Sequence, residues 1–237
     1  MINGIGILAS VAKRQIAKLN SATNNIANVD TPGFKAELLY FLEGSGTETI
    51  SEGASMQESA MAVDYSPGSI RKTGNVLDLA INGEGFFAVQ GKDGIAYTRD
   101  GRFTLNEDGE LVTLSGEYVL GRDGKIVIEG NDVQISERGV ISVDGNEADV
   151  LKVVNFDNPS ALVKSGAALY RNPNDQAVAD EVDNASVQSG HLERSNVQVI
   201  REMIEMINIQ RTFESYQKAI QTISEQDKLS TNRIGKL

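Results

Sequence analysis

The residues that most often carry chemistry are few in this chain. His191 is the single histidine and cysteine is absent, so neither a disulfide nor a thiolate metal site can form. A Ser-His-Asp triad is compatible with the composition, but the G-x-S-x-G elbow that exposes a nucleophilic serine does not occur. The pattern predicts that His191 is a surface residue.

Two glycines could belong to a nucleotide-binding site. Gly83, Gly85 and Ala88 fit the loose G-x-G-x-x-A pattern of a dinucleotide-binding turn. That turn must open a helix, because the helix N-terminus holds the pyrophosphate. Here "GEGFFAVQ" leads into a strand-like run, and the carboxylates nearby lack the one-per-two spacing of a calcium loop. We expect no enzyme activity, no cofactor and no metal.

Charge and hydropathy exclude two further classes of function. The net charge of −11 argues against a nucleic-acid partner, since such a surface needs a basic patch. No stretch reaches the roughly 18 apolar residues that a transmembrane helix needs. The first 20 residues place their charges after a short apolar run, so no cleaved secretory signal is expected.

The two ends of the sequence carry heptad patterns typical of helices. Residues 3–29 and 195–229 are predicted to be helical. The first stripe has two rows: Ile5, Ala12, Leu19 and Ile26, and then Leu8, Gln15, Ala22 and Val29. The second stripe consists of Val199, Met206, Phe213 and Ile220 with Ile209, Tyr216 and Ile223. We expect the stripes to pair with each other; the alternative is that each packs on the protein's own sheet.

The sequence of the middle of the chain predicts short strands joined by tight turns. Five Asp-Gly pairs predict hairpins, since glycine adopts positive φ at low cost: Asp93-Gly94, Asp100-Gly101, Asp108-Gly109, Asp123-Gly124 and Asp144-Gly145. An antiparallel β domain is therefore expected over residues 76–157.

The first helix must end near Val29 or Asp30, in the stretch "NNIANVDTPGFK". Pro32 disfavours the helical conformation at Thr31, and Gly33 permits a turn that other residues resist. Asn24, Asn25 and Asn28 are poor helix formers whose amides can donate and accept hydrogen bonds. They either fix the register of neighbouring helices or simply fray the helix end.

Three stretches, in this order, resemble the bacterial flagellar rod and hook proteins. "SATNNIANVDTPGFKA" is similar to their N-terminal signature, and "GEGFFAVQ" with "YTRDGRF" to their central β domain. "GHLERSNVQVIREMIEMINIQRTFESYQKAIQTI" is similar to their C-terminal signature. The resemblance covers both ends and the centre of the chain.

The resemblance and the patterns together give an expected architecture. The fold class is α+β, with long N- and C-terminal helices forming a coiled-coil-like inner domain and a central all-β antiparallel domain. The expected boundaries are 1–41 and 195–237 for the helical inner domain, 42–75 for a connecting segment, 76–157 for the β domain, and 158–194 for a return segment.

The resemblance implies a structural subunit that polymerises into the axial rod of the flagellar basal body. Its partners would be copies of itself, other rod, hook or basal-body proteins, and the flagellar type III export apparatus. Its location would be the rod that spans the periplasm. Length and the compact middle favour a proximal-rod over a distal-rod subunit. The expected assembly interface comprises Ile5, Leu8, Ala12, Leu19, Ala22, Asn24, Asn25, Ile26, Asn28, Val29, Phe34, Ser195, Asn196, Val197, Val199, Met206, Ile209, Phe213, Tyr216, Ile220 and Ile223.

Two other functions are compatible with parts of the sequence. A secreted trimeric adhesin would carry long uninterrupted heptads in one segment, whereas here they are split between the ends. A glycan-cleaving enzyme would need two carboxylates about 5 or 6.5–9.5 Å apart. Such a separation is a property of the fold and not of the sequence, and turns already account for the aspartates.

Overall fold

A computed structural model describes residues 2–41, 59–173, 177–182 and 185–234. The chain divides into two compact units. The helical unit comprises Met1–Ala27, Glu37–Ala62 and Gln198–Leu237, and the β unit comprises Asn28–Ala36 and Val63–Val197. The chain therefore passes between the units four times.

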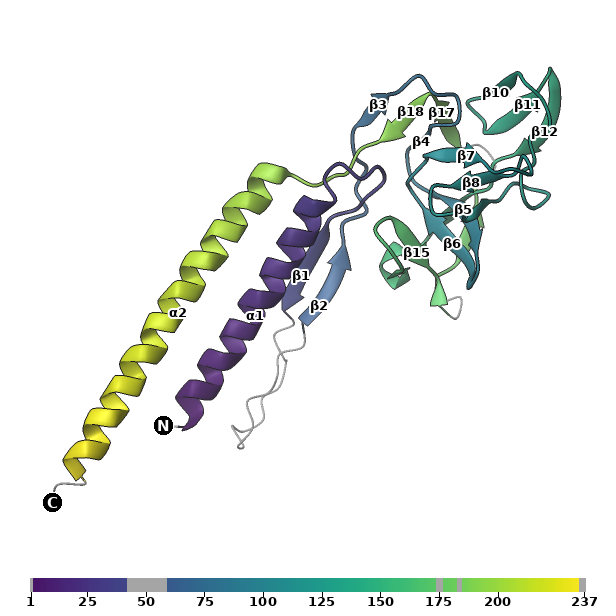
Figure 1. The fold of residues 1–237 in the computed structure, drawn as a ribbon. Coiled ribbons are helices and arrows are strands. Elements are labelled where there is room, and N and C mark those ends of the chain that lie inside the picture. The colour runs from purple at the N-terminus through teal and green to yellow at the C-terminus, as the bar shows by residue number, and fades with distance from the viewer. Residues whose placement is uncertain (1, 42–58, 174–176, 183–184, 235–237) are drawn as a thin grey trace. The chain divides into compact units, whose positions relative to one another are not determined.

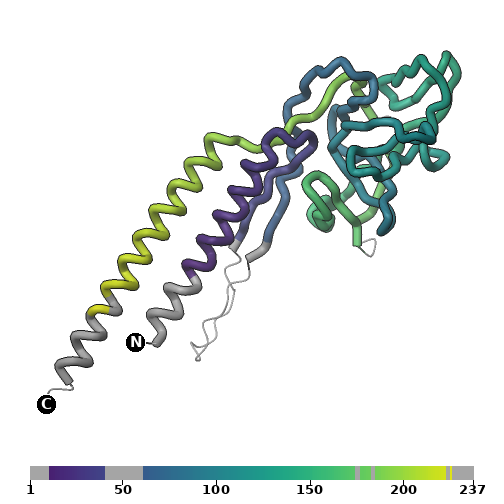
Figure 2. Tube along the Cα trace, in the orientation of Figure 1, coloured from purple at the N-terminus to yellow at the C-terminus, as the bar shows by residue number. Residues whose placement is uncertain are grey.

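The helical unit contains two helices and a hairpin. Helix α1 spans Ile2–Ala27 and helix α2 spans Val199–Ile234. They run antiparallel, side by side, in Figures 1 and 2, and they contact each other. Strands β1 (Glu37–Phe41) and β2 (Ser59–Val63) pair in a two-stranded sheet, and β1 contacts α1. Helix α1 therefore contacts both α2 and β1.

The expected fold class, with long terminal helices in a coiled-coil-like inner domain, is wrong. The described part of the chain has only two α-helices, and most of its elements are strands that form five sheets. A coiled coil needs a continuous seam of buried apolar residues. Among the seam residues whose side chains the structure describes, only Ala22 and Ile209 are buried, and Ile220 is exposed.

The β unit is built from antiparallel strands. The largest sheet has the order β14-β15-β6-β5-β9-β8-β7, with β13 pairing β5 and β16 off this path. Its strands are β5 (Phe86–Gly91), β6 (Gly94–Thr98), β7 (Phe103–Leu105), β8 (Leu111–Thr113), β9 (Tyr118–Val119), β13 (Val153–Phe156), β14 (Val163–Lys164), β15 (Leu169–Arg171) and β16 (Ala179–Glu181). A smaller sheet contains β10 (Val133–Ile135), β11 (Val140–Val143) and β12 (Asn146–Val150).

Two further pairs join the beginning of the β unit to its end. Strand β3 (Ile70–Lys72) pairs with β18 (His191–Glu193), and β4 (Leu79–Asn82) pairs with β17 (Ser186–Ser189). The registers place Arg71 opposite Leu192 and Ile81 opposite Val187. Strands β14–β18, and the short 3-10 helix Pro159–Ala161, lie in residues 158–194, where we expected a return segment.

Strand β5 is buried on both faces, which explains its continuous apolar run. Phe87 and Val89 belong to one core cluster, and Phe86 and Ala88 to another. Phe87 packs edge-on against Phe103 with ring centroids 5.2 Å apart. Because side chains alternate between the two faces of a strand, β5 contributes residues to both core clusters.

Four of the five Asp-Gly predictions are confirmed. Their pairs close the β5–β6, β7–β8 and β11–β12 hairpins and the bridge between Leu120 and Lys125. In each pair the glycine has positive φ: Gly94, Gly109, Gly124 and Gly145. Asp100-Gly101 closes no hairpin. A Cβ on Gly101 would overlap the Leu79 carbonyl oxygen, so this glycine allows two backbones to approach closely.

Candidate functional site

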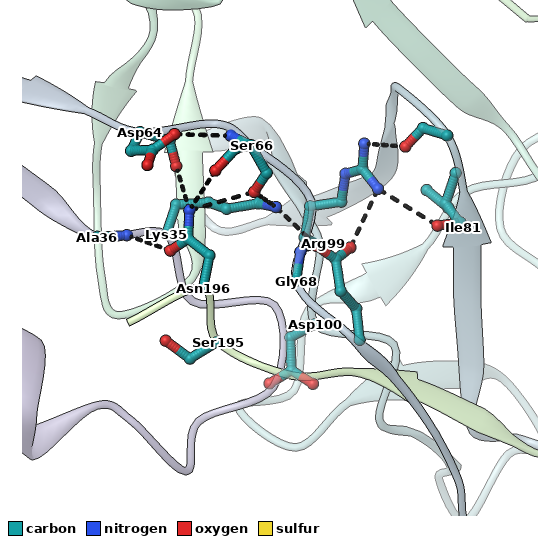
Figure 3. Close-up of polar contacts among 12 residues, drawn as sticks. Lys35, Ala36, Asp64, Ser66, Gly68, Ile81, Arg99, Asp100, Ser195 and Asn196 are labelled. Atoms are coloured by element: carbon teal, nitrogen blue, oxygen red, sulfur yellow. Dashed lines mark hydrogen bonds and ion pairs between the residues drawn. The ribbon is translucent and has the colours of Figure 1, made fainter. Parts of the chain in front are cut away.

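Three segments far apart in the sequence meet inside the β unit (Figure 3). They are the end of the N-terminal motif, the T-R-D-G stretch of the centre, and the beginning of the C-terminal motif. The side chains that join them are Lys35, Arg99, Glu193 and Asn196, which we call the motif junction. All four lie in the β unit.

Glu193 is the anion of the junction and is 1% exposed. Its Oε1 accepts from Lys35 Nζ at 2.6 Å and from the Gly68 backbone N–H at 2.8 Å. Its Oε2 accepts from Arg99 Nη1 at 3.1 Å. One buried carboxylate therefore neutralises two cations that are themselves buried.

The two cations are also bonded to backbone carbonyls. Lys35 Nζ donates to the Ser66 oxygen at 2.8 Å, and Arg99 donates to Gly83 at 2.7 Å and to Ile81 at 3.4 Å. Burial lowers the pKa of Lys35 and of Arg99, because desolvation penalises a charge, and the neighbouring Glu193 opposes that fall. The ion pairs thus offset much of the cost of removing these charges from water.

Asn196 ties three chain segments together. Its Oδ1 accepts from the Ala36 backbone N–H at 2.8 Å, and its Nδ2 donates to the carbonyls of Asp64 at 2.9 Å and Ser66 at 3.1 Å. Ser195 Oγ accepts from the Val197 N–H at 3.2 Å. The S-N-V entry to the C-terminal helix is therefore a backbone-binding motif.

In the helical unit, Asn25 likewise binds backbone groups through its side-chain amide. Its Oδ1 accepts from the Glu37 N–H at 2.8 Å and its Nδ2 donates to the Glu37 carbonyl at 3.0 Å. Ser21 Oγ donates to that carbonyl as well, at 3.0 Å. A buried side-chain amide that satisfies both backbone groups of one residue fixes β1 against the end of α1.

The turn between these two anchors depends on Gly33. Its φ is +68°, and its N–H donates to the Glu193 carbonyl at 2.9 Å. A Cβ at this position would lie 2.5 Å from the Arg99 carbonyl oxygen. Phe34 follows, fully buried with Ala36 and Val197, and Lys164 Nζ lies 4.0 Å from the centre of its ring.

Helix α2 carries apolar residues on two opposite sides. One side contains Ile209, which is buried, with Met206, Phe213 and Tyr216 half-buried beside it. The other side is exposed: Ile200 by 77%, Ile204 by 55%, and Met203 and Ile207 by 49% each. We call these four residues the exposed α2 face. Further along the same side the helix presents Arg211, Glu214 and Lys218, so the apolar face is confined to its first turns.

The geometry offers little for catalysis. Among the described residues no group of three or more His, Asp or Glu side chains could hold a metal ion. His191 is half-buried on β18, with Nδ1 2.8 Å from the Ser189 carbonyl oxygen. Gly83 and Gly85 have positive φ and lead directly into β5, as the turn interpretation predicts. In the part of the chain that the structure describes, no helix is long and apolar enough to cross a membrane.

Comparison with known proteins assigns the chain to a family. Three family models match: a flagella basal body rod protein model over residues 7–35, a flagellar hook protein FlgE/F/G D1 domain model over 80–143, and a flagellar basal body rod FlgEFG protein C-terminal model over 188–233. The flagellar basal-body rod protein FlgF of Caulobacter vibrioides is 37% identical over 228 residues, which cover 93% of both chains. The chain belongs to the flagellar basal-body rod protein family.

Two rod proteins named FlgG are nearly as similar. That of Buchnera aphidicola from Schizaphis graminum is 34% identical and covers 94% of this chain and 96% of its own. That of Bacillus subtilis is 35% identical and covers 88% and 90%. The predicted resemblance to rod and hook proteins is confirmed. The chain is a structural protein of the flagellar basal body and not an enzyme.

The structure places the expected interface residues of this rod protein in different surroundings. Buried are Ala22, Asn25, Phe34, Val197 and Ile209. Half-buried are Ala12, Leu19, Asn24, Ile26, Asn28, Val29, Ser195, Asn196, Val199, Met206, Phe213 and Tyr216. Ile220 is exposed. The side chains of Ile5, Leu8 and Ile223 lie outside the described residues.

Sequence reasoning missed the charged members of the motif junction. Lys35, Arg99 and Glu193 each stand inside a quoted motif, yet nothing in the local pattern separates them from ordinary polar residues. The available signal is that each of the three motifs carries one of these charges. In "GFKA" and "HLE" the charge also stands beside apolar residues.

Replacing Glu193 by glutamine tests the ion pairs. We expect Glu193→Gln to lower the free energy of unfolding of the β unit by about 3–5 kcal/mol at pH 7, because Lys35 and Arg99 then lack their buried counter-ion. Urea unfolding followed by tyrosine fluorescence measures this, since Tyr65, Tyr97, Tyr118 and Tyr170 lie in the β unit. Glu181→Gln is the control, because its partner Lys152 is 3.9 Å away and half-exposed; we expect a loss of about 0–1 kcal/mol.

The deficit of Glu193→Gln should shrink as pH rises towards 10. The pKa of Lys35 is already lowered in the folded state, and removing Glu193 takes away the interaction that raises it. Between the folded pKa and the ordinary lysine pKa of 10.5 the unfolded chain binds more protons, so stability rises with pH in that window. A deficit that stays constant from pH 7 to 10 would contradict the assignment.

The close approach of Gly33 to the Arg99 backbone can be tested separately from the positive φ of Gly33. Gly33→Ala should destabilise the β unit by several kcal/mol, because positive φ costs about 1–2 kcal/mol and the new methyl also meets the Arg99 backbone. Gly74→Ala is the matched control, with φ of +85° and no atom within 4 Å of the added methyl group. Equal urea midpoints for the two variants would show that the close approach is unimportant.

Proposed function

We propose that this chain is a proximal-rod subunit that assembles through its terminal helical unit. A distal-rod role is the alternative, and similarity to both FlgF and FlgG proteins supports either. Its partners are further copies of the chain and other rod, hook or basal-body proteins. The chain reaches the periplasm-spanning rod through the flagellar type III export apparatus.

The observation that carries the assembly proposal is the exposed α2 face. Four large apolar side chains on one side of a helix in a chain of net charge −11 are costly to leave in water. Burying each of them would contribute about 1.5–3 kcal/mol. Ile209, on the opposite side of α2, is already buried within the helical unit. We infer that a neighbouring subunit supplies the apolar cover for the exposed α2 face.

We also include in the proposed interface those expected residues whose side chains are partly exposed to solvent in the single subunit. Met206, Phe213, Tyr216 and Ile220 on α2, and Leu19 and Ile26 on α1, are half-buried or exposed. Those of α2 lie on the side opposite the exposed α2 face, so they and the α1 residues would form a second contact surface. A contact between two different surfaces is heterologous, and one that does not close generates a filament. The buried members, Ala22, Asn25, Phe34, Val197 and Ile209, then shape the subunit that assembles.

A charge on the exposed α2 face should block incorporation without unfolding the subunit. We expect Ile204→Asp to leave the urea midpoints and the circular dichroism unchanged, because Ile204 is more than half exposed. In cells whose own copy is deleted, it should abolish motility and be absent from purified basal bodies. Gln217→Asp adds the same charge at an exposed position on another side of α2 and should restore motility. Swimming cells carrying Ile204→Asp would refute the assembly face.

The position along the rod can be tested in the deletion strain. If the chain is a proximal subunit, basal bodies lacking it should also lack the distal-rod protein, because a distal subunit would have no proximal end on which to assemble. Immunoblots of purified basal bodies measure this, with the membrane-ring protein as loading control. Normal amounts of distal-rod protein in these particles would contradict the proximal assignment and favour the alternative.

A further inference from the structure

Residues 28–36 form an excursion from one unit into the other. The chain leaves the helical unit after Ala27, belongs to the β unit from Asn28 to Ala36, and returns to the helical unit at Glu37. We call these residues the strap. A segment with this course is joined covalently at both of its ends to one unit while its own packing belongs to the other.

The strap's attachment to the helical unit is fixed by Asn25. Both backbone groups of Glu37 are bonded to the Asn25 amide, at 2.8 and 3.0 Å, so the residues on either side of the strap are held together. Ser21 adds a bond to the Glu37 carbonyl. These groups are buried, and breaking their bonds exposes unsatisfied polar atoms to an apolar surrounding.

The strap's own body is fixed in the β unit by six contacts of three kinds. Its backbone donates from Gly33 to the Glu193 carbonyl and from Ala36 to Asn196, and accepts at Ala36 from the Asp64 N–H. Lys35 forms the ion pair with Glu193 and a bond to Ser66. Phe34 is fully buried in the small cluster with Val197.

Within the β unit, the residues next to the other passages of the chain are joined by hydrogen bonds. Val63 and Val197 are the residues of the β unit that adjoin them. Asn196 donates to the Asp64 carbonyl and accepts from Ala36, so it bonds next to three of the four passages. The fourth begins with Asn28, whose carbonyl accepts from the Thr31 N–H at 3.1 Å.

From this arrangement we propose that the strap couples the local stability of the two units within one chain. Loosening the Asn25–Glu37 bonds frees both ends of the strap, and loosening the Lys35–Glu193 pair frees its body. Either event raises the entropy of the same residues, so each unit opens more readily when the other has opened. The coupling is a property of the single subunit and does not rest on the rod-assembly proposal.

Hydrogen exchange of the full chain, read by mass spectrometry, tests the coupling with two variants, one in each unit. Asn25→Ala, in the helical unit, should accelerate exchange of the Gly68 N–H in the β unit about tenfold, the equivalent of one lost buried hydrogen bond. Glu193→Gln, in the β unit, should accelerate exchange of the last turn of α1 by a similar factor.

Matched controls separate coupling from general destabilisation. Thr23→Ala removes one exposed hydroxyl from the same turn of α1, and Glu181→Gln removes an exposed charge from the β unit; neither should change exchange in the other unit. If Asn25→Ala abolishes the helical signal, Asn25→Asp replaces it, since its carboxylate keeps an acceptor for the Glu37 N–H but cannot donate to the Glu37 carbonyl. Variants that change exchange in their own unit alone would overturn the proposal.

Discussion

The stability of the β unit depends on the two ion pairs that the Glu193 carboxylate forms. This carboxylate lies between Lys35 and Arg99, each of which would be costly to bury alone. The three charges come from the beginning, the middle and the end of the unit, so none can be buried until the chain has brought the others into place. Strand pairing of β3 with β18 and of β4 with β17 serves the same purpose, because it carries Glu193 back to the segment that holds Gly68.

Local sequence patterns predicted where the helices and hairpins lie better than which of these elements pack against each other. Heptads located both helices, and α1 ends at Ala27, two residues before the expected position. Asp-Gly pairs located the hairpins, except where Gly101 serves a close approach to Leu79. The coiled coil was wrong because a heptad shows only that one side of a helix is apolar. It does not show that β1 covers part of α1, or that α2 has a second apolar side around Ile204.

The candidate site was harder to predict than the fold. Asn25 was identified as an amide able to donate and accept hydrogen bonds, and the structure shows it doing both within the chain. Asn196 was expected only as an interface residue, and it also does both within the chain. The ion pairs of Glu193 join residues that are 158 and 94 positions apart, and no periodicity connects such residues. The strands β14–β18 are short and polar on their exposed sides, so their sequence resembles that of a loop until their partners are known.

The two pieces of the β unit interrupt the helical unit in the sequence, and the three charges of the motif junction all lie within these two pieces. Lys35, Arg99 and Glu193 fall on one side of the passages, and Asn25 and Glu37 fall on the other. Recombination that exchanged both pieces of the β unit, residues 28–36 and 63–197, would keep Lys35, Arg99 and Glu193 together. Relatives could therefore exchange β units while keeping their own helices, whereas a chimaera cut at residue 63 alone would inherit Glu193 without its native Lys35.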